Sequence, residues 1–311
     1  MRLAIRGVRV RKLTIGYIVK KVRDLYYNAK VFTEGYGIRA KIKLIPHTAY
    51  RVFYCIGGTA IAGTTAHVAE HMSSTLTKSR TSLLMEFAPD VVIKNRNGLF
   101  KCRKGSGDIW ITSEECEIDL TRYFKKVQSG IFVDIGANVG RYTVKLAKQI
   151  GNKGKVVAIE CDPENYEALI ENIKLNKLDN VYAFNLACYD REEDITLFMA
   201  SMKYKVFSSI KRDTSGMCDR TLTVHGTTLD NILKGLGVEK VDVVKIDVEG
   251  AEQEVLTGMK ETIARSNNIE ILFEAWDDIY LEGCKKILYG YGLIVEDKEI
   301  ESRVYRARRN G

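Results

Sequence analysis

The segment at residues 133–140, Val-Asp-Ile-Gly-Ala-Asn-Val-Gly, constrains the fold more than any other part of this chain. The apolar residues at 131–133 are typical of a buried strand, and Gly136 and Gly140 allow a sharp turn onto a helix. A second apolar run at 156–159 ends at Glu160, whose carboxylate can accept hydrogen bonds from both hydroxyls of a ribose. This order predicts a nucleoside-binding α/β unit, and an ordinary βαβ unit with a glycine turn is the alternative.

The spacing of the glycines narrows the choice of ligand. Dinucleotide sites normally carry G-x-G-x-x-G because pyrophosphate lies against bare backbone at a helix N-terminus. Here the middle glycine is absent between Gly136 and Gly140, and Asp134 adds a negative charge that phosphates would disfavour. S-adenosylmethionine has a ribose, a positive sulfonium and no phosphate, so we expect it as the cofactor.

A second charged strand end lies at residues 241–252, Val-Asp-Val-Val-Lys-Ile-Asp-Val-Glu-Gly-Ala-Glu. Alternation puts Lys245 and Asp247 on one face, although a covered parallel strand should be almost wholly apolar. Such charges are costly unless they are paired or used. Because open α/β sheets bind ligands beyond the carboxyl ends of their strands, we expect Asp247 to face the same crevice as Asp134. The alternative is that Asp247 or Glu249 only caps the next helix.

Together these motifs resemble those of the FkbM-type S-adenosylmethionine-dependent methyltransferases. The turn at 134–140 and Glu160 fit the family, residues 228–232 fit as well, and the stretch at 245–252 is the most specific part. The resemblance runs from about Asn97 to Gly292. It implies an α/β, seven-stranded, Rossmann-like class I methyltransferase fold that usually methylates a hydroxyl oxygen. Phe273-Glu-Ala-Trp276 departs from the family, which often has a histidine soon after the acid.

The cofactor contacts are expected from the turn and from the ends of three strands. The third of these strands is predicted at 181–187, where Asn185 can bond the adenine base or close a turn. The predicted cofactor-binding residues are Asp134, Gly136, Asn138, Gly140, Glu160 and Asn185.

The reaction chemistry indicates the catalytic candidates. Methyl transfer to a hydroxyl requires the nucleophile to be held in line and to lose its proton. Asp247 is the first candidate for the base, Glu249 the second and Glu274 the third, while Lys245 can orient the acceptor oxygen or keep Asp247 ionised. A divalent cation held by Asp247 with Glu249 or Glu274 is an alternative that we do not favour. Asp-Val-Glu-Gly differs from the Asn/Asp-Pro-Pro-Tyr pattern of base N-methylation, which favours an oxygen acceptor on a small molecule or glycan.

Charge is uneven along the chain. Residues 1–100 hold 17 Lys/Arg against 5 Asp/Glu, whereas residues 130–311 hold 25 against 30. We predict a basic N-terminal extension or small domain at 1–96 and a methyltransferase domain at 97–311. An amphipathic basic helix at 17–26 can lie on an anionic membrane surface, bind nucleic acid, dock on a partner, or simply be solvated. An RNA methyltransferase that uses this region, or a non-catalytic cofactor-binding scaffold, is therefore an alternative function.

The spacing of the cysteines and the hydropathy of the chain indicate the cellular compartment. The seven cysteines are scattered without a C-x-x-C pair, which indicates neither a zinc site nor a disulfide framework and favours a reducing compartment. His67 and His71 have i,i+4 spacing, but a surface helix is the preferred interpretation. The apolar stretch at 52–66 is short for a membrane span, and no signal peptide is indicated. We expect a cytoplasmic protein, with membrane association through residues 1–30 as an alternative.

The remaining periodicities predict further elements. They are strands at 98–101 and 108–111, a helix at 114–126 capped by Ser113, a helix opened by Pro163, an added β-layer over the crevice from 195–199, 206–210 and 222–225, helices at 228–236 and from about 250 to 264, a strand at 269–274, and an antiparallel pair at 291–296 and 303–307.

Overall fold

The computed structural model describes Gly35, Arg39 and residues 88–114, 116–200, 208–210, 218–296 and 299–309. Residues Asn95–Lys101 and Trp110–Gly311 form one compact unit, and the other residues belong to a second. The predicted helix at 17–26, the apolar stretch at 52–66 and the pair His67 and His71 lie outside the described residues. Within the described ranges, no helix is long and apolar enough to cross a bilayer. The domain boundary at 96/97 stays a prediction.

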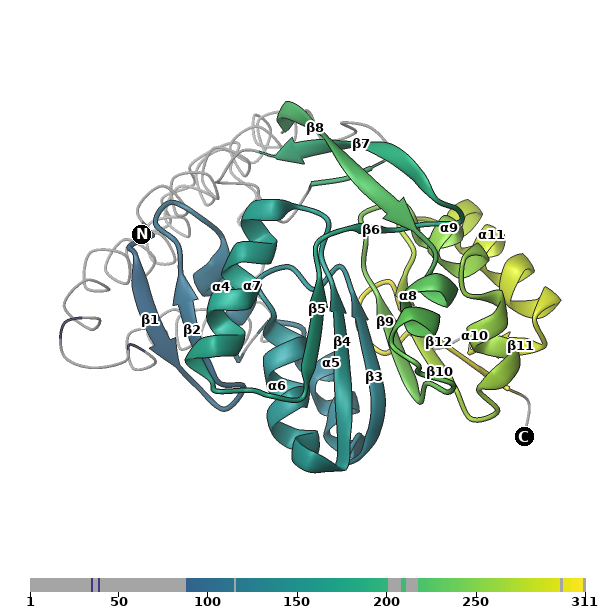
Figure 1. The fold of residues 1–311 in the computed structure, drawn as a ribbon, viewed down its shortest axis with the longest axis horizontal. Coiled ribbons are helices and arrows are strands. Elements are labelled where there is room, and N and C mark those ends of the chain that lie inside the picture. The colour runs from purple at the N-terminus through teal and green to yellow at the C-terminus, as the bar shows by residue number, and fades with distance from the viewer. Residues whose placement is uncertain are drawn as a thin grey trace, which may run out of the picture. The chain divides into compact units, whose positions relative to one another are not determined.

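A seven-stranded sheet in the order β11-β12-β10-β9-β3-β4-β5 forms the centre of the larger unit (Figure 1). The neighbours from β5 to β10 pair in parallel, and β12 runs antiparallel to both β10 and β11. Because β4 and β9 flank β3, the chain order reverses beside β3, which is where such sheets bind ligands. This confirms the predicted Rossmann-like fold. The strands are β3 (Gly130–Ile135), β4 (Gly154–Ile159), β5 (Val181–Phe184), β9 (Val243–Ile246), β10 (Glu270–Glu274), β11 (Leu293–Val295) and β12 (Val304–Arg309).

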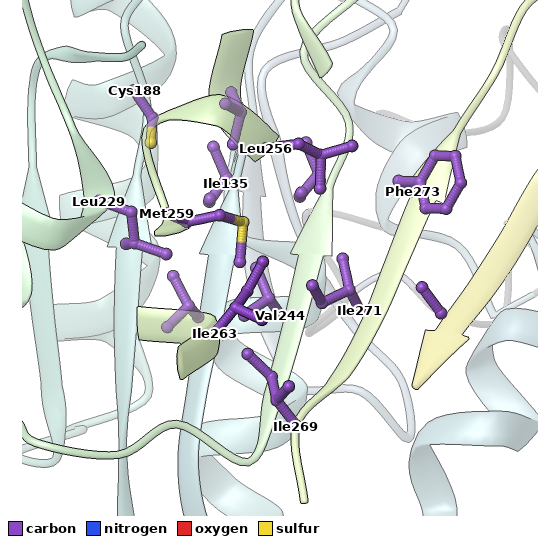
Figure 2. Close-up of a cluster of buried hydrophobic side chains, with 14 of the residues drawn as sticks. Ile135, Cys188, Leu229, Val244, Leu256, Met259, Ile263, Ile269, Ile271 and Phe273 are labelled. Carbon is purple, nitrogen blue, oxygen red and sulfur yellow. The ribbon is translucent and has the colours of Figure 1, made fainter. Parts of the chain in front are cut away.

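One face of the sheet packs against helices that belong to the second half of the chain. Ile135, Val244 and Ile271 point into this layer together with Leu256 and Phe273 (Figure 2). These side chains are almost fully buried, and their alternation along each strand matches a sheet covered on this side. The helices are α8 (Leu229–Gly235), α9 (Glu252–Thr257), α10 (Lys260–Arg265) and α11 (Asp278–Gly290).

The opposite face packs against the helices around the glycine turn. Phe132 and Val156 pack there with Phe124, Tyr142 and Leu146. Alternation along the strands puts Asp134 and Lys245 on this same face, so two charged side chains interrupt an otherwise apolar layer. The helical segments are α5 (Ile118–Tyr123), η1 (Phe124–Lys126), α6 (Arg141–Ile150), η2 (Gly151–Lys153), which lies between α6 and β4, and α7 (Pro163–Leu175), which begins at Pro163 as predicted.

The predicted added β-layer is confirmed as a separate sheet in the order β6-β8-β7. Its strands are β6 (Ala187–Cys188), β7 (Glu193–Ala200) and β8 (Cys218–Thr227), drawn above the arrowheads of β3 and β4 in Figure 1. Ser209 bridges to Phe198, while residues 206–207 of the predicted middle strand lie outside the described residues. The Ser208 hydroxyl donates to Asp162 Oδ2 (3.0 Å) and the Ser209 hydroxyl to the Glu249 carbonyl (2.8 Å). The small sheet is therefore attached to the carboxyl ends of β4 and β9.

Near the start of the described chain, β1 (Val91–Lys94) was not predicted, whereas β2 (Leu99–Cys102) confirms the strand at 98–101. The predicted strand at 108–111 is wrong, because residues Asp108–Thr112 form the helix α4. Asp108 accepts hydrogen bonds from the Arg103 backbone (2.9 Å) and the Arg103 side chain (2.7 Å), which closes the preceding turn. A short apolar run does not distinguish strand from helix by its periodicity.

Two predicted helix boundaries also need correction. The helix expected from Ser113 begins only at Ile118, because the Arg141 side chain binds the Cys116 carbonyl and holds residues 116–117 in a turn. The helix expected up to about 264 is split into α9 and α10 around Gly258. There the backbone lies against Tyr189, and a Cβ at Gly258 would be 1.9 Å from the Tyr189 carbonyl oxygen. The helix at 228–236 and the final strand pair are confirmed as α8, β11 and β12.

Candidate active site

The turn after β3 is wedged between the ends of its two neighbouring strands. Gly136 has a φ of 74°, and a Cβ there would lie 1.8 Å from the Asp247 carbonyl oxygen, so only glycine fits. The N–H groups of Gly136 and Ala137 donate to the Ile159 carbonyl at 2.9 and 3.0 Å. The turn is therefore fixed to β4 on one side and to the segment after β9 on the other.

The second half of the turn leads into α6. Asn138 and Gly140 take left-handed φ values of 51° and 88°, and the Asn138 Oδ1 accepts a hydrogen bond from the Val139 N–H (2.8 Å). A Cβ at Gly140 would lie 2.6 Å from Leu169 Cδ1, so this glycine allows α6 and α7 to pack closely. The predicted residues Gly136, Asn138 and Gly140 thus shape the turn through their backbone, and direct contact with a cofactor stays a prediction for each.

Glu160 ends β4 with its carboxylate directed at the turn. It is 6% exposed, and its Oε2 accepts from the Asn138 N–H (2.7 Å) while its Oε1 accepts from the Asp162 N–H (2.9 Å). Burial raises the pKa of Glu160 to about 7, and the two N–H donors oppose that shift. Each carboxylate oxygen has two acceptor positions, so one position on each oxygen is left by these two bonds, and contact of Glu160 with a ribose stays a prediction.

Asn185 follows β5 and is exposed. Its Nδ2 donates to the carbonyls of Glu160 (2.9 Å) and Cys161 (3.2 Å), which ties the end of β5 to the end of β4. This bond explains why the strand predicted at 181–187 stops at Phe184 and why Ala187 joins a different sheet. Of the two roles open for Asn185, turn closure is the one its amide group performs, and a contact with the adenine base stays a prediction.

Lys245 joins the two acidic residues that were expected to face one site. Asp134 and Lys245 are direct neighbours in the parallel register of β3 and β9. The Lys245 Nζ lies 3.5 Å from Asp134 Oδ1 and 3.2 Å from Asp247 Oδ2, and it donates to the Gly136 carbonyl at 3.2 Å. The lysine that was unexpected in a buried strand is therefore paired on both sides.

The two partners of Lys245 differ in exposure. The Asp134 side chain is 1% exposed and its Oδ2 accepts from the Thr143 hydroxyl (2.6 Å), whereas the Asp247 side chain is 33% exposed. Asp134 thus acts on the site through Lys245, and Asp247 presents its carboxylate at the surface of the sheet end. The helix-capping alternative is wrong, because α9 begins at Glu252 after Ala251, beyond both Asp247 and Glu249.

Further carboxylates gather beside Asp247. Burial and then the charge of Asp247 raise the pKa of Glu249 to about 9 and the pKa of Glu274 to about 8. Glu252 is fully buried, and its Oε1 accepts from the N–H groups of Val248 (3.1 Å) and Gly250 (3.3 Å), which shapes the loop after β9. In the part of the chain that the structure describes, no group of three His, Cys, Asp or Glu side chains is arranged to hold a metal ion.

The sequence interpretation missed Glu117, Arg141 and Tyr142. Glu117 Oε2 accepts from the Tyr142 hydroxyl (2.6 Å) and from Arg141 Nη1 (3.0 Å), and the Lys245 Nζ lies 5.6 Å from the centre of the Tyr142 ring. A signal was present, because a cation in the first turn of α6 opposes the helix dipole. Arg141 therefore indicated an acidic partner elsewhere in the chain.

Comparisons with known proteins agree with this geometry. A family model described as the methyltransferase FkbM domain matches residues 134–302. The chain is 26% identical over 151 residues to the 2-O-methyltransferase NoeI of Sinorhizobium fredii, an alignment that covers 45% of this chain and 61% of that protein. It is 26% identical over 154 residues to the hexuronic acid methyltransferase AglP of Haloferax volcanii, covering 49% and 59%.

The chain thus aligns with 61% and 59% of the length of these two relatives. A solved structure with a related backbone is the precorrin-6y C5,15-methyltransferase of Geobacter metallireducens GS-15, at 14% identity and a TM-score of 0.43, covering 71% of this chain and 99% of that one. The family match extends over more than half of the sequence and includes the turn, Glu160 and the Lys245–Asp247 segment. The chain belongs to the FkbM family of S-adenosylmethionine-dependent methyltransferases.

Proposed function

We propose that this enzyme transfers the methyl group to a hydroxyl oxygen of a small molecule or glycan. The observation that carries this proposal is the half-buried Asp247 carboxylate, which lies 3.2 Å from Lys245 beside the glycine turn. A hydroxyl needs such a base close to the cofactor, because it must lose its proton as the oxygen is methylated. The relatives NoeI, named a 2-O-methyltransferase, and AglP, named a hexuronic acid methyltransferase, support an oxygen acceptor.

The cofactor-holding residues lie on the β3–β4 side of the site. Glu160 would hold the ribose hydroxyls, and the turn at 136–140 would let the cofactor approach the backbone closely. S-adenosylmethionine supplies, when bound, a methyl carbon activated by a positively charged sulfonium. Lys245 offsets the charge of one of its two partners, Asp134 and Asp247, so one net negative charge is left at the end of β9, and this suits a cationic ligand.

The proton-accepting residues lie on the β9–β10 side. Asp247 is our first candidate for the base, because it is the more exposed partner of Lys245 and its carboxylate is next to the turn. Glu249 and Glu274 have raised pKa values and favour their protonated forms at neutral pH, so they suit hydrogen bonding to the acceptor better than proton removal. Lys245 orients the Asp247 carboxylate, and Asp134 balances the charge of Lys245.

The test is methyl transfer from cofactor labelled in the methyl group. The probes are a neutral methyl glycoside, a hexuronic acid, a small primary amine and a transfer RNA, each compared with the variant Asp247→Asn. We expect label in a hydroxyl-bearing sugar as an ether that resists alkaline hydrolysis, and little label with Asp247→Asn. Label found only in the amine would contradict oxygen methylation, and label found only in RNA would contradict a small-molecule or glycan acceptor. Full activity of Asp247→Asn would remove Asp247 as the base.

A further inference from the structure

A third acidic residue, Glu117, lies near Lys245 and comes from outside the segment that the family model matches. Glu117 comes directly before α5 and has a left-handed φ of 45°, which is uncommon for a residue with a side chain of this size. Its Oε2 receives both the Tyr142 hydroxyl (2.6 Å) and Arg141 Nη1 (3.0 Å). Arg141 also binds the Cys116 carbonyl and the Thr121 hydroxyl (3.0 Å), so it holds the chain on both sides of Glu117.

Tyr142 connects Glu117 to the charged centre of the site. Its side chain is 4% exposed, so its hydroxyl needs a partner, and Glu117 provides one. The face of the ring lies 5.6 Å from the Lys245 Nζ, within the range of a cation–π contact. The ammonium group is thus enclosed by the Tyr142 ring, Asp134, Asp247 and the Gly136 carbonyl.

A purely structural role does not account for Glu117. The segment α5–η1 has other attachments to α6, since the Lys145 Nζ donates to the Thr121 carbonyl (2.9 Å) and the Gln149 Nε2 to the Phe124 carbonyl (2.8 Å). The Glu117 carboxylate also adds to the negative charge around Glu274, where it contributes to the raised pKa after burial, Asp247 and Glu252. A residue with an unfavourable backbone conformation, whose carboxylate holds the tyrosine that packs against Lys245, is more consistent with a role in the site.

We infer that Glu117 is a positioning residue: through the Tyr142 hydroxyl it fixes the tyrosine ring against Lys245 and so holds the ammonium group beside Asp247. This inference rests on the proposed function only for the role of Asp247 as the base. The placement of Lys245 can be tested without any methyl acceptor. Two variants separate the effect of the hydrogen bond from the effect of the Glu117 charge. Tyr142→Phe removes only the hydroxyl, and Glu117→Gln keeps an acceptor oxygen without the charge.

The first measurement is the rate at which an amine-reactive ester labels Lys245, read by mass spectrometry, with Lys101 as an exposed reference in the same molecule. Losing one hydrogen bond that holds the ring should raise Lys245 labelling about tenfold in Glu117→Ala and in Tyr142→Phe. The double variant should show no further increase, because both changes break the same contact. Glu117→Gln should stay close to the parent protein. Gln149→Ala is the matched control, because it weakens the attachment of η1 without touching Glu117.

Two outcomes would overturn the inference. Equal labelling in Glu117→Gln and Glu117→Ala with a normal Tyr142→Phe would mean that Glu117 acts only through its charge. The same increase in Gln149→Ala would mean that general loosening of α5–η1 is responsible. If Lys245 labelling changes as expected while Asp247→Asn keeps full methyl transfer, the positioning role stands and the proposed role of Asp247 fails.

Discussion

Glu160 Oε2 accepts a hydrogen bond from the Asn138 N–H at 2.7 Å, which ties the acid at the end of β4 to the turn that follows β3. Its Oε1 is held by the Asp162 N–H at 2.9 Å. Both oxygens are therefore oriented by backbone groups of two different loops. A carboxylate fixed in this way loses little conformational freedom when it binds a hydroxyl pair, which favours affinity.

Glu160→Ala should weaken the binding of S-adenosylmethionine by about 10- to 100-fold, which corresponds to the net loss of about one hydrogen bond to a charged group at about 1.5–3 kcal/mol. Calorimetric titration of the purified protein measures this directly. Glu164→Ala is a suitable control, since Glu164 lies nearby on α7 but pairs with Arg220 at the surface. Unchanged affinity in Glu160→Ala, or stronger binding of NAD than of S-adenosylmethionine, would contradict the assignment of the turn.

The affinity for S-adenosylmethionine should also depend on pH. Burial raises the pKa of Glu160 to about 7, whereas ribose hydroxyls and a sulfonium both favour the ionised form. Binding should therefore be strongest above pH 7 and weaken as the pH falls through that value. Titrations between pH 5.5 and 8.5 give the profile, in which Glu160→Gln should lose most of the pH dependence. A parent profile that is flat across this range would show that Glu160 does not ionise on binding.

Gly136→Ala should destabilise the protein strongly. The φ of 74° alone costs a residue with a Cβ about 1–3 kcal/mol, and the added Cβ would lie 1.8 Å from the Asp247 carbonyl oxygen. Gly235→Ala serves as the control, since no described atom lies within 4 Å of a Cβ there. Urea unfolding of both variants tests the difference. Equal stabilities would mean that the turn can move away from the Asp247 backbone without cost.

Lys245→Met should lower the free energy of unfolding by about 3–5 kcal/mol, because it leaves the buried Asp134 carboxylate without its counter-charge. Adding Asp134→Asn should restore part of the loss. Lys101→Met, which removes a partner of an exposed ion pair with Glu171, should change stability by less than about 1 kcal/mol. Denaturant midpoints and slopes for the set give the values. A double variant no more stable than Lys245→Met would show that Lys245 has a packing role instead.

The parts of the site that follow directly from a strand end were predictable from the sequence. The turn at 136–140, Glu160 and the pairing of Lys245 with Asp247 each depend on a few consecutive residues, whose pattern shows both the strand and its exit. The α/β class followed in the same way, since apolar runs of parallel-strand type alternate with helices. The family resemblance then supplied the seven-stranded Rossmann-like fold.

The parts that depend on distant contacts were not predictable. Glu117 meets Tyr142 across 25 positions of sequence, and no local pattern shows that its carboxylate turns toward Lys245. The expected contact of Asp134 with the cofactor stays a prediction, whereas its burial and its contacts with Thr143 and Lys245 had no local signal in the sequence. The helix at Asp108–Thr112 likewise depends on an Arg103 contact that the short apolar run at 109–111 does not reveal.

The position of β12 between β10 and β11 has a consequence for synthesis of the protein. β11 leaves the ribosome before β12, but in the sheet it is joined to β10 only through β12. Until β12 emerges, β10 exposes an unpaired hydrogen-bonding edge next to the half of the sheet that carries the active site. Until β12 has docked, the β10 edge is therefore the part of the sheet most prone to pair with other chains during folding.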